Sequence, residues 1–329
     1  MLAETVLAET DDWFLAHGLT YFVPEQRAAA RQALRLRRTV PLGVVLGLGA
    51  AGLGGVLAWL SDQVSAAPAL LLSLGIVAAL SYALTALKGS HVVGWALRRA
   101  LSSLRTLLPM MSRALPLLLI FVTFLFINGE VWQMAASLET GVLWLTVLLF
   151  GGLAGGFLLV RLPEEVDRVD DAVDAEFLRR TCQGTPVEFE CERLLARSAH
   201  DPVSHATVTG FERWNLIVVL VVIQAVQVLL LAFTVFVFFL FFGALIIDVG
   251  IQESWTGIPV EDFSNLPGLT SISVPLAKVS LFLAAFSGLY LTVATVTDDT
   301  YREQFFSEIL RELENAVGVR AVYRTLRAG

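Results

Sequence analysis

The stretch Trp214–Ile247, WNLIVVLVVIQAVQVLLLAFTVFVFFLFFGALII, decides the fold class of this chain. It contains no Asp, Glu, Lys or Arg, and as a helix it would measure about 50 Å at 1.5 Å per residue. The hydrocarbon core of a bilayer is about 30 Å thick, so this run is more than long enough to cross a membrane. We expect a steeply tilted helix, a helix that projects beyond the bilayer, or a break near Gly243.

Five further apolar runs accompany this stretch. Hydrophobic residues make up 56% of the chain and charged residues only 16%, with a mean hydropathy of +0.71. A soluble domain is about one quarter charged. The sequence therefore predicts an all-α, polytopic membrane protein with six transmembrane helices. The other five predicted spans cover about Val40–Leu60, Ala69–Leu87, Ala114–Ile127, Gly141–Val160 and Val274–Val296.

Lys and Arg residues predict the orientation of these spans. They occur before the first span, after the second, fourth and sixth spans, and in none of the segments 61–68, 128–140 and 248–273. Because Lys and Arg are enriched in cytoplasmic segments, both termini are predicted to be cytoplasmic, in a bacterial inner (plasma) membrane.

This topology divides the chain into five parts. They are a cytoplasmic or interfacial N-terminal segment (1–39), spans one to four (40–160) with an amphipathic connector (88–113), a cytoplasmic helical insertion (161–213), spans five and six (214–297) with an external loop (248–273), and a cytoplasmic C-terminal helix (298–329).

Four arginines form a basic stripe ahead of the first span. Arg27, Arg31, Arg35 and Arg38 are spaced by four, four and three residues, so they share one helix face. Such a face would contact anionic lipids of the inner leaflet, or an acidic protein partner. The alternative is an interfacial helix that only sets the topology. The acidic residues at the start of the insertion could lie opposite these arginines.

Small residues recur every four positions in two spans. Such spacing lets helix backbones approach closely in lipid. We expect them to pack helices within one subunit, with a contact between subunits as the alternative. The residues are Gly43, Gly47, Ala51 and Gly55 in the first span and Gly151 and Gly155 in the fourth.

Few polar residues lie in the spans, and these are the candidates for a translocation path. Gln224 and Gln227 share a face of the fifth span, near its predicted mid-depth. They line a hydrated path or bond a neighbouring helix. At the predicted outer ends of two spans, Glu130 could pair with Lys278. The remaining candidates are Asn128, at the same outer end, and Phe238 and Phe242, as a hydrophobic gate.

No enzyme or cofactor motif is recognisable. The sequence lacks a Walker A loop, a Gly-x-Gly-x-x-Gly turn and a His-Glu-x-x-His pair. Cys182, Cys191, His200 and His205 supply zinc-ligand types, but without the short Cys-x₂₋₄-Cys spacing of zinc knuckles. The net charge of −7 disfavours nucleic acid as a partner. We therefore expect no enzymatic activity and no cofactor.

Four short strings carry a resemblance. The chain resembles a family of uncharacterised actinobacterial polytopic membrane proteins, which implies the membrane class and topology but no mechanism. The strings are Gly18-Leu19-Thr20-Tyr21-Phe22-Val23-Pro24-Glu25, Phe126-Ile127-Asn128-Gly129-Glu130-Val131-Trp132-Gln133, Glu212-Arg213-Trp214-Asn215 and Tyr301-Arg302-Glu303-Gln304-Phe305-Phe306.

These features favour a homo-oligomeric ion channel or pore, selective for cations because the external loop is acidic and has no Lys or Arg. A small-solute transporter with its site at Gln224 and Gln227 is one alternative. A membrane scaffold that holds a cytoplasmic protein partner is the other.

Overall fold

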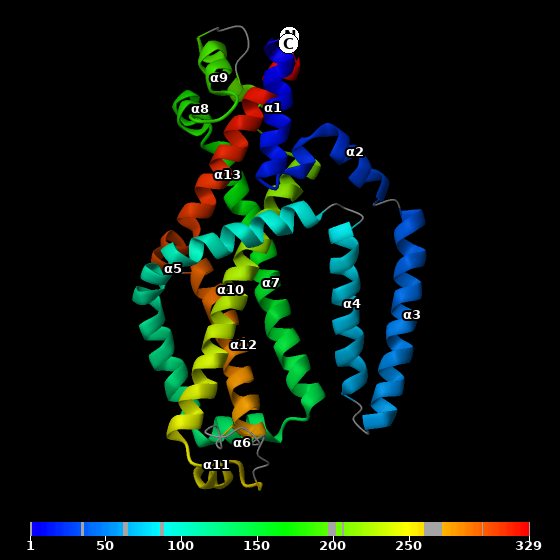
Figure 1. Cartoon of the computed structure of the whole chain (residues 1–329), viewed down its shortest axis with the longest axis vertical. Coiled ribbons are helices and arrows are strands. Elements are labelled where there is room, and N and C mark those ends of the chain that lie inside the picture. Colours follow the sequence, from blue (N-terminus) through cyan, green and yellow to red (C-terminus); the bar gives the residue numbers. More distant parts are fainter. Residues whose placement is uncertain are drawn as a thin grey trace.

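The computed structural model describes residues 2–33, 36–61, 65–85, 89–196, 202–205, 207–259, 272–297 and 299–328. These residues form helices and no β-strand, which confirms the all-α class (Figure 1). The molecule has a central helix bundle, a helical hairpin beside it, a layer at one end that contains both termini, and two short helices at the other end.

The central bundle contains the longest apolar helices. They are α7 (Thr140–Asp171), α10 (Gly210–Ile246) and α12 (Val274–Thr297), with the second half of α5 (Gly89–Phe126) packed beside them. By length and composition, three helices of the described residues can cross a membrane, or up to four if the bent pair of α5 and α6 (Gly129–Ser137) is one span.

Helix α10 is unbroken, so the break considered near Gly243 is absent. The helix runs through Gly243 to Ile246, and this glycine lies against Leu276 of α12 and Phe126 of α5. A Cβ atom at position 243 would collide with Leu276, because the two helices approach closely there. Gly243 therefore serves packing and not a change of helix direction.

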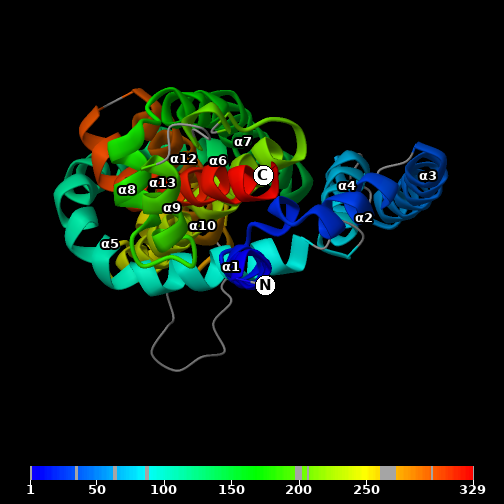
Figure 2. The same cartoon turned by 90° about the horizontal axis from the view of Figure 1, so that it is seen from above.

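Helices α3 (Leu36–Ser61) and α4 (Ala66–Thr85) form a hairpin that stands to one side of the bundle (Figure 2). They meet at Gly54, where a Cβ would lie 3.0 Å from the Ala67 carbonyl oxygen. Two hydrogen bonds tie the hairpin to the α7 side, from Trp144 Nε1 to Ser73 Oγ (2.9 Å) and from Ser65 Oγ to Glu139 (2.8 Å). The hairpin thus has few polar attachments to the bundle.

Helix α5 contains both the amphipathic connector and the third span in one continuous helix, as expected of a connector that leads into that span. It ends at Phe126, and the chain then bends by 68° into α6. Asn128 begins α6 as its N-cap, since its side chain accepts a hydrogen bond from the Glu130 amide (2.8 Å). The short helix α11 (Val249–Thr256) lies beside α6 at the same end.

The layer that contains both termini is here called the terminal layer. The acidic start of the insertion is not one helix, because α7 ends at Asp171 and Asp174 caps a new helix by accepting from the Phe177 amide (2.7 Å). The layer consists of α1 (Leu2–Ala16), η1 (Thr20–Phe22), α2 (Pro24–Ala33), α8 (Ala175–Cys182), α9 (Glu188–Leu195), η2 (Pro202–His205) and α13 (Asp299–Ala328).

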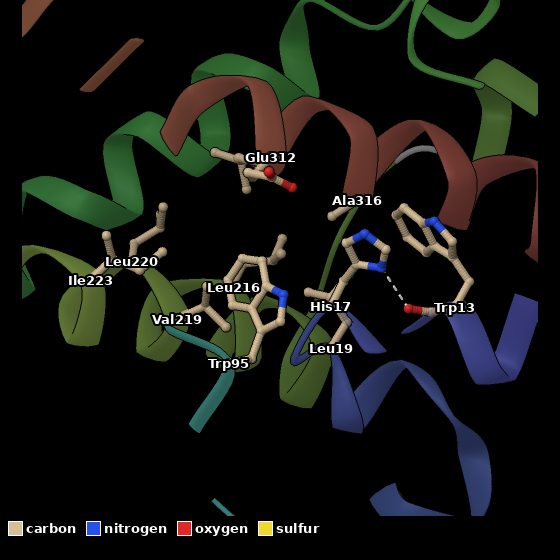
Figure 3. Close-up of a pocket in the computed structure, with 11 residues that line it drawn as sticks. Trp13, His17, Leu19, Trp95, Leu216, Val219, Leu220, Ile223, Glu312 and Ala316 are labelled. Carbon is tan, nitrogen blue, oxygen red and sulfur yellow. Dashed lines mark hydrogen bonds between the residues drawn. The ribbon is translucent and has the colours of Figure 1, made fainter. Parts of the chain in front are cut away.

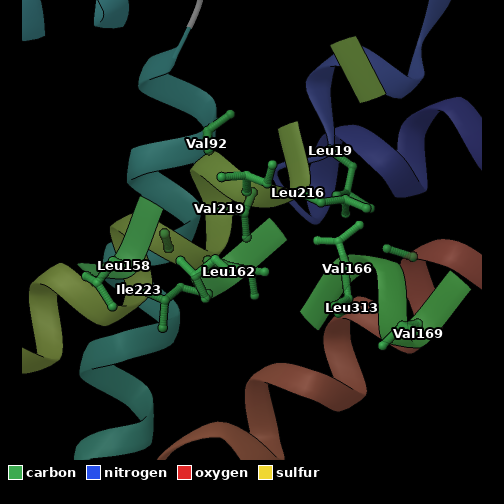
Figure 4. Packing of buried hydrophobic residues seen from close by; sticks show 14 of the residues in the cluster. Leu19, Val92, Leu158, Leu162, Val166, Val169, Leu216, Val219, Ile223 and Leu313 are labelled. Carbon is green, nitrogen blue, oxygen red and sulfur yellow. The ribbon is translucent and has the colours of Figure 1, made fainter. Parts of the chain in front are cut away.

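One apolar core joins the terminal layer to the bundle (Figure 4). On α7, Leu162, Val166 and Val169 recur at spacings of four and three and are buried, as expected of an amphipathic helix. They pack with Leu216 of α10 and Leu313 of α13 in the same cluster. The first turns of α10 are therefore part of the terminal layer's core.

The outer faces of the apolar helices carry large exposed hydrophobic side chains. A soluble protein rarely exposes apolar patches of this extent, so they indicate association with a membrane. Those more than 70% exposed are Leu48, Trp59, Ile120, Phe124, Val160 and Leu245.

Candidate functional site

Two amide side chains of α10 are buried without hydrogen-bond partners. Gln224 is 0% exposed and Gln227 is 8% exposed. Among the described residues, neither the oxygen nor the nitrogen of the Gln224 amide has a partner, and the Gln227 oxygen has none. A buried polar atom without a partner costs about 1–3 kcal/mol, so this pair is the clearest candidate for a ligand site within the bundle.

Close contacts between α10 and α12 locate this pair. A Cβ at Gly288 of α12 would lie 3.2 Å from Val228 of α10, and Gly243 of α10 approaches Leu276 of α12. The two helices are therefore antiparallel. In this antiparallel register, Gln224 lies at the level of Thr292, and Gln227 lies about one turn further along, at the level of position 289. Thr292 is also fully buried, and its hydroxyl donates to the Gly288 carbonyl (2.9 Å).

The amide pair lies nearer to the terminal-layer end of α10, at Gly210, than to its other end, at Ile246. At 1.5 Å per residue, Gln224 is about 33 Å from Ile246, at the far end of α10. The hydrocarbon core is only about 30 Å thick. The depth of the pair within a membrane stays a prediction, because the first turns of α10 belong to the terminal layer and hydropathy alone does not separate them from a span.

Asn215, about two and a half turns before Gln224, has hydrogen-bond partners for its amide. It is fully buried, and its oxygen accepts from the Tyr21 amide (2.7 Å) while its nitrogen donates to the Gly18 carbonyl (3.1 Å). Gly18 adopts a left-handed φ of 72° and lies against Trp95. Asn215 therefore fastens the N-terminal segment to α10, a role that sequence analysis did not assign.

Glu212 is the centre of a buried ion cluster that sequence analysis also missed. It is 3% exposed and forms ion pairs with Arg27 of α2 and, at 2.6 Å, with Arg320 of α13, while Arg324 lies 4.0 Å away. Burial lowers the pKa of the Arg320 guanidinium, and Glu212 opposes that shift. The Glu212 carboxylate thus connects α2, which precedes the first apolar helix α3, with α13, which follows the last apolar helix α12.

The predicted basic stripe is divided by these contacts. Arg27 is paired with Glu212 and also donates to the Tyr21 and Phe22 carbonyls (3.0 and 3.1 Å). Its partner is therefore not one of the acidic residues at the start of the insertion. Arg31 is exposed and lies 5.5 Å from the centre of the Phe211 ring. Arg35 and the Arg38 side chain lie outside the described residues.

Lys278 does not pair with Glu130 in the described part of the chain. Its Nζ donates to the carbonyls of Ala136 (3.1 Å) and Leu138 (2.6 Å), at the C-terminal end of α6. A cation at this end donates hydrogen bonds to the terminal carbonyls and interacts favourably with the negative end of the helix dipole. Glu130 is exposed in the first turn of the same helix, and Asn128 is its N-cap. Lys278 therefore has a structural role.

The aromatic candidates belong to a ring cluster at the α6 end of the bundle. Phe238 and Phe242 stack with centroids 5.4 Å apart, and Phe242 meets Phe126 at 5.9 Å. Phe126 in turn stacks on Phe239 (4.6 Å) and meets Trp132, whose Nε1 donates to the Phe126 carbonyl (2.6 Å). Their contacts within the subunit are those of a packed aromatic core.

The predicted small-residue faces do not pack within the subunit. A Cβ at Gly47, Gly55, Gly151 or Gly155 would meet no atom within 4 Å, and Ala51 is exposed. Packing of α3 uses the neighbouring Gly54 instead. The surroundings of Gly43 lie outside the described residues. The expectation of packing within one subunit was therefore wrong at these positions, because the hairpin stands apart from the bundle.

The cysteines form a thiol pair between α8 and α9. Both are free and buried, and a hydrogen bond between them raises the pKa of the Cys182 thiol and lowers that of Cys191. His200 and the His205 side chain lie outside the described residues. Within the described ranges, no group of three or more His, Cys, Asp or Glu residues is arranged to hold a metal ion.

A small cavity lies where α1, α5, α10 and α13 meet (Figure 3). Its volume is about 20 Å³, space for about one water molecule. His17 stacks on Trp13 and its Nδ1 lies 2.8 Å from the Trp13 carbonyl oxygen, while Trp95 closes the opposite side. This cavity is too small to hold an organic ligand.

Comparison with known proteins gives the chain no relatives. No protein-family model matches it, and no curated protein or solved structure matches it significantly.

Proposed function

We propose that this protein is a six-span inner-membrane transporter for a small, uncharged polar solute. Both termini lie in the cytoplasm, and the solute is bound inside each subunit. The observation that carries the proposal is the buried amide pair Gln224 and Gln227 of α10, with three amide atoms that have no partner among the described residues. In a membrane-spanning bundle, such polar groups mark binding sites and pathways.

The chemistry of the amides supports an uncharged substrate. Each amide offers both donors and an acceptor, and the register brings the Thr292 hydroxyl to the level of Gln224. No Asp, Glu, Lys or Arg occurs between Trp214 and Ile247, so this part of α10, which contains Gln224 and Gln227, offers no charge to bind an ion or relay a proton. A solute with its own donors and acceptors would satisfy the orphaned atoms.

Flux through proteoliposomes tests the proposal. Permeation of urea and of glycerol is followed by stopped-flow light scattering, and uptake of Rb⁺ is followed by isotope counting. The wild type is expected to pass at least one uncharged solute, and Gln224→Leu is expected to reduce that flux at least about tenfold. The control is Thr234→Val on the exposed side of α10, where the hydroxyl donates only to Leu230 (2.8 Å). Absence of flux above protein-free liposomes for both uncharged solutes would contradict the proposal.

A homo-oligomeric cation channel is the second candidate, and the unfilled glycine faces favour it. Gly47, Gly55, Gly151 and Gly155 leave open helix surfaces of the kind that associate in lipid. Rb⁺ flux without solute flux would support this candidate over the transporter.

Mass photometry in nanodiscs tests the oligomer directly. A closed ring of three or more subunits is the expected result for a channel, and it should be converted to monomers by Gly151→Leu but not by Gly94→Leu in the first half of α5, where a Cβ would also meet no atom within 4 Å. A wild-type monomer would exclude a pore on an axis between subunits.

A further inference from the structure

A cleft in the terminal layer has an excess of positive charge. It encloses about 340 Å³ where the start of α2, the start of α10 and the last turns of α13 meet. This volume is within the range of small-molecule sites. The side chains that line it include Arg27, Glu212, Tyr323, Arg324 and Arg327.

Glu212 does not neutralise the arginines of this cleft. Its carboxylate is already shared by Arg27 and Arg320, and Arg324 lies at the 4.0 Å limit of an ion pair. Arg327 lies 5.3 Å from the centre of the Tyr323 ring, and the described carboxylates form no ion pair with it. Four arginines thus surround one carboxylate, in a chain whose net charge is −7.

The other acidic group at this site is also engaged. Asp11 of α1 accepts a hydrogen bond from the Tyr323 hydroxyl at 2.5 Å, which fixes the ring on which Arg327 lies. Arg324 and Arg327 are both exposed, so their guanidinium groups are accessible from the cleft and from solvent. The wall therefore presents two arginines for which the described carboxylates form no ion pair shorter than 4.0 Å, on a helix that the ion cluster holds in place.

We propose that this cleft binds a phosphate-bearing anion, with Arg324 and Arg327 as its direct ligands. A guanidinium presents paired N–H donors that match two phosphate oxygens, and the two arginines lie three residues apart on one helix face. The anion supplies the negative charge that Glu212 alone does not. This site does not rest on the proposed transport function, because none of its residues lies in the bundle.

The position of the cleft favours a soluble phosphate compound over a lipid headgroup. Glu212 lies twelve residues before Gln224, about 18 Å further from the apolar bundle along α10. A headgroup at the membrane surface would have to leave the bilayer plane to reach it. Bound anion would link α2, which leads to α3, with α13, which follows α12.

Calorimetric titration of the full chain tests the site. The protein is placed in phosphatidylcholine nanodiscs at about 0.15 M ionic strength and titrated with pyrophosphate and with ATP. The Arg324→Gln/Arg327→Gln variant is expected to bind at least about tenfold more weakly than the wild type. The control is Arg98→Gln/Arg179→Gln, which removes the same charge from exposed positions outside the cleft.

The outcomes separate the sources of phosphate. Saturable binding of either soluble probe, lost in the cleft variant alone, supports a soluble ligand. The second arm uses nanodiscs that contain phosphatidylglycerol. If neither soluble probe binds but phosphatidylglycerol binds in the cleft, and if only the cleft variant loses this binding, the site is assigned to a lipid headgroup. Absence of saturable binding in both arms, or equal loss in the control, overturns the site. The unfolding temperature of each variant is measured to confirm that it remains folded.

Discussion

Asn215 and Gln224 are both fully buried amides of α10, but only Asn215 has hydrogen-bond partners. The difference follows from what each residue faces. Asn215 faces the backbone of Gly18 and Tyr21, where an irregular segment leaves a carbonyl and an N–H to be satisfied. Gln224 faces helices of the bundle, whose backbone groups are already bonded within each helix.

Leucine substitution distinguishes these two amides. Asn215→Leu leaves the Gly18 carbonyl and the Tyr21 amide without partners, so we expect a loss of about 2–4 kcal/mol and a lower unfolding temperature in nanodiscs. Gln224→Leu removes atoms that have no partner, so we expect unchanged or increased stability. Equal destabilisation by both substitutions would mean that Gln224 is a structural residue and would remove the basis of the transport proposal.

Glu212 is the residue on which the ion cluster depends. Glu212→Gln retains the side-chain volume but leaves Arg320, which is 1% exposed, without its carboxylate. Removal of one partner of a buried ion pair costs about 3–5 kcal/mol. We expect a large decrease in unfolding temperature, and little change for Glu164→Gln, whose side chain is 56% exposed. A small effect at Glu212 would show that Arg27 and Arg320 find other partners.

At the scale of elements, the apolar helices could be predicted from the sequence and their attachments could not. Long uncharged runs predicted α10 and α12 to within a few residues, because hydropathy reports on the solvent that a segment requires, whereas α7 continues past the predicted end at Val160 to Asp171. The amphipathic connector leads into the third span, as predicted, and the two form one continuous helix, α5. Arg320 and Glu212 are 108 residues apart, and no local pattern connects them.

The candidate site was predicted in part. Gln224 and Gln227 were selected because polar residues are rare in apolar runs, and the structure places both in the interior of the bundle. Lys278 was selected for the same reason, but it caps α6 instead. Sequence spacing identifies an unusual residue, whereas the tertiary fold decides whether a backbone carbonyl is available to satisfy it.

Gly318 tests how closely α13 packs on α8. A Cβ at this position would collide with the Thr181 hydroxyl, so Gly318→Ala is expected to destabilise the terminal layer by about 1–3 kcal/mol. Thr181→Ala removes the nearest atom, so the double variant Gly318→Ala/Thr181→Ala should recover part of the stability that Gly318→Ala loses. Gly151→Ala is the control, since it meets no atom within 4 Å and a helical alanine should be neutral or stabilising. Thermal unfolding in nanodiscs measures all four proteins.

At the scale of the whole molecule, the proposed six-span topology places α11 outside the cell and the start of α5 inside. Ser254→Cys in α11 and Ser90→Cys in α5 are both exposed positions, and the two native cysteines are buried. A membrane-impermeant maleimide applied to intact cells should label position 254, and should label position 90 only after permeabilisation. Labelling of both positions in intact cells, or of position 90 alone, would overturn the topology.

The continuity of α10 has a mechanical consequence. The N-terminal segment is attached to its first turns through Asn215, and the C-terminal helix through the Glu212–Arg320 ion pair. An α-helix transmits rotation and tilt along its length, because every turn is bonded to the next. Any reorientation of the Gln224–Gln227 segment would therefore displace both chain ends together, so that a probe on either terminus would report events that occur among the apolar helices.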